Sequence, residues 1–103
     1  MSMVGGASAV KPATREVQEL CNKVREALQN QAGRTFGVYT AISFRSQMVA
    51  GTNYFVKVQV DENDEHFHLR IFVPLPSTNF QPSLAAYQPG HTAASDLEYF
   101  DAK

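Results

Sequence analysis

Cysteine is almost absent from this 103-residue chain, in which Cys21 is the single example. An internal disulfide needs two cysteines, and small secreted domains usually carry several. No apolar run approaches the roughly 20 residues of a membrane-spanning helix. Residues 1–10 lack the basic and apolar regions of a signal peptide, and the chain has no Asn-x-Ser/Thr sequence. These absences predict a cytoplasmic protein with no membrane partner.

An excess of one charge is lacking as well. Nine Lys and Arg residues are scattered among ten Asp and Glu residues, and the formal net charge is −1. Nucleic-acid binding requires a basic stripe, so no nucleic-acid partner is expected. Hydrophobic residues make up 44% of the chain, which is enough for one core. We expect a single domain over residues 1–103, with the small, polar and glycine-containing residues 1–10 as a mobile N-terminal arm.

A stripe of apolar residues at helical spacing predicts one long helix that runs to about Gln31. Thr14 can cap its first turn, and Gly33 can end it. The residues of the stripe recur at i, i+3, i+4, i+7 and i+11 and are Val17, Leu20, Cys21, Val24 and Leu28.

After Gly33 the hydrophobic period changes to two. This alternation predicts strands over residues 36–45, 54–60 and 66–73, followed by a strand near 84–88 and a closing segment near 97–100. A helix followed by a meander of strands indicates an α+β domain in which the helix lies across one face of a twisted antiparallel sheet. The polar positions of the strands are expected to face solvent; they are Lys57, Gln59, His66, His68 and Arg70.

Candidates for chemistry are few. His66 and His68 could form half of a metal site, but no cysteine or acidic cluster with ligand spacing completes it, so solvated histidines are favoured. Cys21 lies on the apolar stripe, which favours packing in the core over nucleophilic catalysis. The acidic residues within 61–65 lack the ligand spacing and central glycine of a calcium loop. We therefore expect no catalytic residue, no metal and no cofactor, with a small enzyme using His68 or His91 as the rival hypothesis.

Two apolar segments lie where polar turns are expected. Residues 47–51 connect two predicted strands and carry Met48, Val49 and Ala50 in a row, and Leu75 lies in a second apolar tip at residues 73–76. Short loops cannot easily fold back onto a core, and exposed apolar tips commonly mark a binding surface. The sequence therefore favours a protein-binding function over an enzymatic one.

The segment Gln47-Met48-Val49-Ala50-Gly51 resembles the Gln-x-Val-x-Gly signature of the cystatin superfamily, with Met48 in place of the commoner valine. The similarity continues through residues 52–58 and includes Lys11-Pro12-Ala13-Thr14, residues 68–72, Leu75-Pro76 and the ending Tyr99-Phe100. In these segments the chain resembles the stefin (type 1) branch of cystatins, and its B-type more than its A-type members. The resemblance covers essentially the whole chain, although Val73-Pro74 stands where stefins usually have polar residues.

The resemblance implies the cystatin fold, in which one long helix is wrapped by a five-stranded antiparallel sheet. It also implies a reversible, tight-binding inhibitor of papain-like cysteine proteases such as cathepsins B, H, L and S, and not an enzyme. In that family a wedge of three apolar pieces blocks the protease cleft. Carried onto this chain, the protease-binding residues are Val4, Gly5 and Gly6, then Gln47, Met48, Val49, Ala50 and Gly51, and finally Leu75 and Pro76.

Two further expectations follow from the resemblance. A side chain at position 51 would obstruct close approach to the cleft. The chain is expected to be a monomer that can form a domain-swapped dimer, because residues 47–51 contain no Asn-Gly or Asp-Gly pair to favour a tight turn. A scaffold protein that has lost inhibition remains an alternative.

Overall fold

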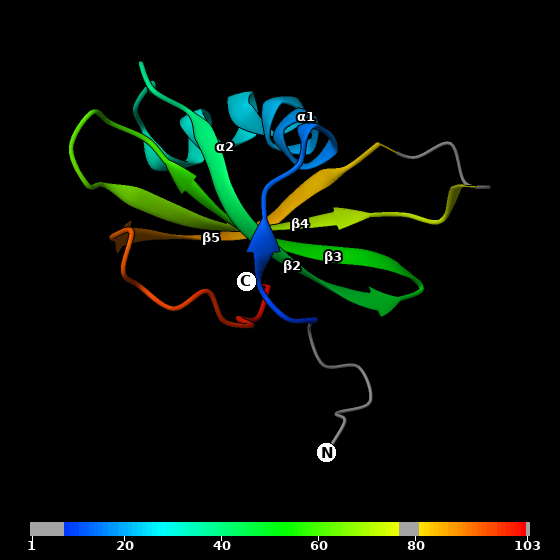
Figure 1. The fold of residues 1–103 in the computed structure, drawn as a ribbon. Coiled ribbons are helices and arrows are strands. Elements are labelled where there is room, and N and C mark those ends of the chain that lie inside the picture. The colour runs from blue at the N-terminus through cyan, green and yellow to red at the C-terminus, as the bar shows by residue number, and fades with distance from the viewer. Residues whose placement is uncertain (1–7, 77–80, 103) are drawn as a thin grey trace.

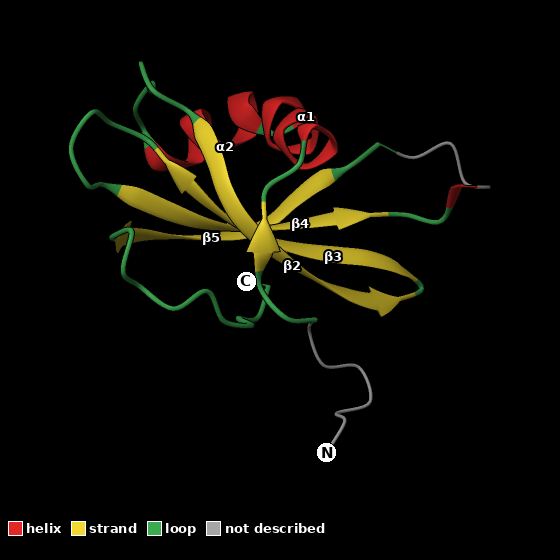
Figure 2. Cartoon of the chain, viewed as in Figure 1, coloured by secondary structure: helices red, strands yellow, loops and turns green. Residues whose placement is uncertain are grey.

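The computed structural model describes residues 8–76 and 81–102. Five strands form one antiparallel sheet in the order of the sequence, and two helices lie across one of its faces (Figures 1 and 2). This confirms the expected α+β architecture. Within the described ranges, no helix has the length and apolar character needed to cross a membrane. The elements are β1 (Lys11–Pro12), α1 (Arg15–Lys23), α2 (Arg25–Ala32), β2 (Thr40–Val49), β3 (Gly51–Gln59), β4 (His66–Val73) and β5 (Ser83–His91).

The helical region has the predicted ends but is divided. The hydroxyl oxygen of Thr14 accepts a hydrogen bond from the backbone N–H of Val17 at 3.2 Å, and Gly33 ends α2 with a left-handed φ of 74°. The expected single long helix is wrong at Val24, where φ is −102° and ψ is 6°. The Val24 N–H bonds the carbonyl of Cys21, three residues back, at 3.2 Å. This tighter turn separates α1 from α2 while residues of both helices stay buried against the twisted sheet.

The main core lies between the helices and the sheet. The predicted helical stripe packs there against the even-numbered residues of β3 and the odd-numbered residues of β4, as the period-two pattern requires. Its fully buried members include Cys21, Leu28, Val56, Val58, Leu69 and Ile71. The strand predicted to start at residue 36, however, is β2 and begins at Thr40. Phe36 and Tyr39 stack on each other in the loop before it.

The second face of the sheet does not face solvent, which corrects the expectation for its polar residues. Residues 92–102, here called the C-terminal segment, run beneath the sheet on the side opposite the helices (Figure 1). Lys57, His66 and His68 are consequently buried, with exposed fractions of 6%, 3% and 1%. The period-two alternation is present as predicted, but Lys57 and Arg70 donate to carbonyls of the covering segment instead of to water, and the ring of His66 lies 3.0 Å from the Asp64 carbonyl.

Three basic side chains hold the C-terminal segment. Each extends from a different strand and donates hydrogen bonds to backbone carbonyls, so its charge is solvated by peptide dipoles. Arg45 bonds Leu97 at 2.8 Å, Lys57 bonds Ala93 and Ser95 at 2.7 and 2.5 Å, and Arg70 bonds Phe100 at 2.8 Å.

An aromatic cluster completes the attachment of the C-terminal segment. Phe55 of β3 is fully buried, and its ring centroid lies 5.4 Å from that of Tyr99 and 5.8 Å from that of Phe100. The guanidinium of Arg70 lies 5.6 Å from the centre of the Phe55 ring. The segment therefore forms a second, smaller core on this face.

His68 stacks on His91 on the face of the sheet that the C-terminal segment covers. The ring centroids are 3.6 Å apart and the planes differ by 8°. Burial lowers the pKa of His68 to about 3, with further lowering by the adjacent His91, Lys57 and His66. The carboxylate of Asp64 lies 3.6 Å from Nδ1 of the neighbouring His66. His68 is therefore neutral in the folded protein throughout the mildly acidic range.

This arrangement predicts a loss of stability in acid. Between the unfolded pKa of 6.5 and the folded pKa of about 3, the unfolded chain binds a proton at His68 that the folded chain does not. The free energy of unfolding should thus fall as the pH drops below 6.5, by at most about 1.4 kcal/mol per pH unit from this residue. Urea unfolding of the wild type and of His68→Leu at several pH values checks this. Equal slopes against pH in the two proteins would contradict it.

Candidate functional site

The first apolar tip is a tight hairpin. We expected residues 47–51 to form a connection, but β2 runs to Val49 and β3 begins at Gly51, so Ala50 alone lies between them. Gln47 pairs with Asn53, Met48 with Thr52 and Val49 with Gly51. The expected loop is therefore wrong in extent, because backbone pairing continues almost to the tip.

Apolar side chains extend from this hairpin into solvent. Met48 is 77% exposed and Val49 is 46% exposed. Behind them the amide nitrogen of Asn53 donates to the side-chain oxygen of Gln47 at 2.9 Å, and Asn53 is itself buried. This cross-strand bond supports the hairpin from within and leaves its apolar residues free for contact.

The second apolar tip lies at the same end of the sheet. β4 ends at Val73, which pairs with Thr52 of the first hairpin, and the chain continues to Leu75 and Pro76. Leu75 is 49% exposed, and Pro76 is also exposed. The ends of β3 and β4 lie side by side there (Figure 1). The structure thus brings Met48, Val49 and Leu75 to one end of the molecule.

The third expected piece, formed by Val4, Gly5 and Gly6, lies outside the described residues. The described chain begins beside the first hairpin, however. The Ser8 N–H donates to the Ser46 carbonyl at 2.7 Å, and the Ser46 N–H donates to the Ser8 hydroxyl at 3.1 Å. Arg45 donates to the Ser8 carbonyl at 2.8 Å. Sequence analysis gave no indication of this pairing, because it depends on backbone groups and a single hydroxyl.

Gly51 is buried where the two tips meet. Its φ of +125° is one that residues with a side chain rarely adopt. A Cβ atom here would lie 2.6 Å from the Val73 carbonyl oxygen and 2.8 Å from Cζ of Phe72. The fold itself therefore requires glycine at position 51, whether or not a partner is bound.

The residues considered for chemistry form no reactive site. Cys21 is fully buried, and burial raises the pKa of its thiol to about 12. Over the described ranges, no three His, Cys, Asp or Glu residues are placed to hold a metal ion. Asp61 caps its own turn by accepting from the N–H groups of Asn63 and Glu65, each at 3.0 Å. Packing in the core explains the position of Cys21, and local hydrogen bonding explains the acidic residues of the turn.

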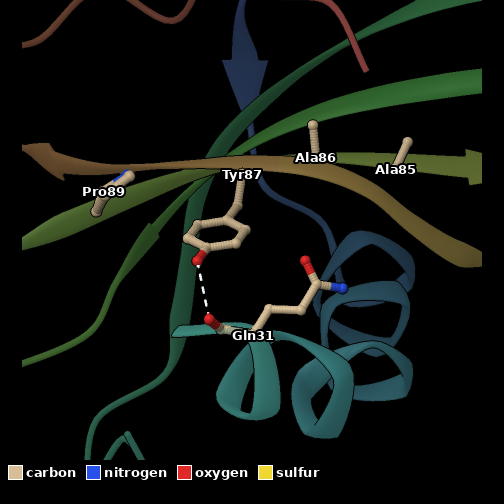
Figure 3. A pocket seen from close by; sticks show the side chains of 5 residues that line it. All are labelled: Gln31, Ala85, Ala86, Tyr87 and Pro89. Carbon is tan, nitrogen blue, oxygen red and sulfur yellow. Dashed lines mark hydrogen bonds between the residues drawn. The ribbon is translucent and has the colours of Figure 1, made fainter. Parts of the chain in front are cut away.

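A hollow of about 290 Å³ lies on the helix side of β5 (Figure 3). It is lined by Gln31, Ala85, Ala86, Tyr87 and Pro89. The Tyr87 hydroxyl donates to the Gln31 carbonyl at 3.2 Å, so it is already engaged (Figure 3). Neither His68 nor His91 lines this hollow, so the hollow gives the rival enzyme hypothesis no support.

Comparison with known proteins identifies the family of the chain. The model of the cystatin domain matches residues 5–88. Over 98 residues, covering 95% of this chain and 99% of each relative, the chain is 45% identical to cystatin-B of Bos taurus and 44% identical to those of Homo sapiens and Sus scrofa. The chain belongs to the cystatin family. The resemblance to the stefin branch is thereby confirmed. This cystatin is an inhibitor of cysteine proteases and not an enzyme.

One residue at the site of this cystatin was not singled out from the sequence. Phe72 lies on β4 on the same face as His66, His68 and Arg70. An aromatic residue in that otherwise polar row was the signal that could have identified it. Its ring occupies the space beside Gly51.

The geometry at Gly51 predicts a large effect of a small substitution. Gly51→Ala should lower the free energy of unfolding by roughly 1–3 kcal/mol, because it adds a clash with the Val73 carbonyl to an unfavourable φ. Gly37→Ala is the matched control, since a Cβ there meets nothing within 4 Å and its φ is not positive. Urea midpoints of the two variants check this, and equal midpoints would contradict it.

Proposed function

We propose that this cystatin is a reversible, tight-binding inhibitor of papain-like cysteine proteases that blocks the active-site cleft with a three-part apolar wedge. The wedge consists of Val4, Gly5 and Gly6, of Gln47, Met48, Val49, Ala50 and Gly51, and of Leu75 and Pro76. The observation that carries the proposal is the exposure of Met48, Val49 and Leu75 at one end of a single rigid sheet. Exposed apolar residues cost solubility unless a partner covers them.

The inhibitor needs no reactive group for this mechanism. The nucleophile belongs to the protease, and occupation of the cleft excludes the substrate. The backbone of the first hairpin is paired up to Val49, so little conformational freedom is lost when it docks. Burial of Met48 and Val49 on this paired hairpin then stabilises the complex with little opposing cost of ordering the hairpin.

The third piece of the wedge is proposed from the family resemblance. In it Val4 occupies a pocket on the substrate side, and Gly5 lets the backbone turn away from the catalytic cysteine. The pairing of Ser8 with Ser46 supports this assignment, because it starts the described chain beside the first hairpin. Residues 1–10 act in this proposal as an arm of the single domain.

The proposed targets are proteases of the cathepsin B, H, L and S type, and the proposed location is the cytoplasm. Support for the targets comes from membership of the cystatin family. Support for the location is the single, buried cysteine, because a domain that needs no disulfide suits a reducing compartment.

Titration of active papain tests the proposed function. Activity should fall in proportion to added inhibitor and vanish at one molecule per active site. Val49→Asp should weaken inhibition by roughly tenfold or more, because docking would bury an unpaired carboxylate. Ile42→Asp is the matched control: Ile42 is also β-branched and on β2, is 39% exposed, and lies away from the two tips. Undiminished papain activity with the wild-type protein would favour the scaffold alternative, and equal loss in both variants would place the contact elsewhere.

We also propose that the native monomer can convert to a domain-swapped dimer. If the turn at Ala50 straightens, β2 and β3 become one long strand, and the helices with β2 can pack on a second copy. The exposed Ala50 and the positive φ of Gly51 support a turn that is held by its surroundings more than by its own sequence.

The dimer should form slowly after partial unfolding and should not inhibit papain, because straightening removes the first hairpin of the wedge. Size-exclusion chromatography before and after mild urea treatment, with papain titration of each peak, measures both properties. A dimer that inhibits as well per chain as the monomer would contradict a swap through this turn.

A further inference from the structure

The first hairpin is flanked by backbone contacts on both sides. β1 pairs with β2 through Lys11–Phe44 and Pro12–Ser43, and Ser8 extends this contact to Ser46. Beyond Ser46, β2 pairs with β3 as far as Val49, and β3 pairs in turn with β4 from Thr52 onward. The β4 strand therefore contributes to the position of the hairpin tip through β3.

On the β4 side, the ring of Phe72 fills the place of the missing side chain of Gly51. An ideal Cβ on Gly51 would lie 2.8 Å from Cζ and 2.9 Å from Cε1 of Phe72. Phe72 pairs directly with Asn53, so its ring leans diagonally across the strand towards Gly51. Such cross-strand coverage of a glycine by an aromatic ring stabilises sheet register where glycine alone would leave it weak.

The same strand leads to the second tip. Val73 follows Phe72, its carbonyl oxygen also borders Gly51, and Leu75 lies two residues further along the chain. Contact at Phe72 thus fixes the first hairpin relative to the start of the second tip. A wedge made of two independently moving tips would lose that relative freedom on docking, whereas a joined pair has lost it already.

We infer that Phe72 is the positioning residue of the wedge, acting through Gly51 to hold the two tips as one preformed surface. This inference rests on the proposed function for its effect on inhibition, but its structural part can be tested without a protease. Phe72 is half-buried and acts from within the inhibitor.

The test compares Phe72→Ala with Phe72→Leu and with a control, Phe67→Leu. Phe67 lies at the other end of β4, is 2% exposed and packs on Phe36 and Tyr87, so its truncation weakens the fold away from the wedge. Two quantities are measured for each protein: the dissociation rate from papain, and amide hydrogen exchange at residues 49–53 in the free inhibitor.

Phe72→Ala should accelerate exchange at residues 49–53 and speed dissociation by roughly tenfold, with a smaller change in the association rate. Phe72→Leu should give an intermediate effect, because it retains apolar bulk without the flat ring. Phe67→Leu should change neither quantity at the hairpin, even where it lowers the unfolding midpoint.

Unchanged exchange at residues 49–53 in Phe72→Ala would overturn the inference whatever happens to inhibition. Faster dissociation with unchanged exchange would show that Phe72 contacts the protease directly, and would also overturn it. Failure of the wild type to inhibit papain would instead refute the proposed function, and the exchange measurement would still decide whether Phe72 positions the hairpin.

Discussion

The pairing of β3 between β2 and β4 is the constraint on which the rest of the structure depends. Val56 and Val58 face the helices from this strand, while Phe55 and Lys57 face the C-terminal segment, and all four are buried. A strand covered on both faces fixes its register strongly, because a slip of one residue would exchange an apolar face for a polar one. Both apolar tips inherit their positions from this register, since Gly51 begins β3 and Val73 pairs with Thr52.

The sequence identified the elements that obey simple periodicity. The helix cap at Thr14, the helix end at Gly33 and the full extent of β4 were predicted, because each has a strong local signal. The apolar residues of the two tips were found for the opposite reason: Met48 and Leu75 violate the expected polarity of turns. Features that break a pattern were thus as informative about the site as features that obey one.

The C-terminal segment could not be predicted in the same way. Its attachment consists largely of side chains that donate to backbone carbonyls, and a carbonyl accepts equally well whichever residue carries it. In the sequence, the buried Lys57 and His68 consequently look the same as polar residues on a strand face that is exposed to solvent. The division of the helix at Val24 is similar, because no glycine or proline lies there to mark it in the sequence.

The burial of Cys21 has a consequence for the chemistry that this protein can tolerate. A fully buried thiol with a pKa of about 12 forms almost no thiolate at neutral pH, and the thiolate is the species that oxidants and disulfides attack. The fold also contains no disulfide for a reductant to open, since Cys21 is the single cysteine. Its cysteine chemistry is therefore insensitive to the redox potential. An inhibitor of enzymes whose own nucleophile is a cysteine can thus keep the same form in conditions that switch its targets on or off.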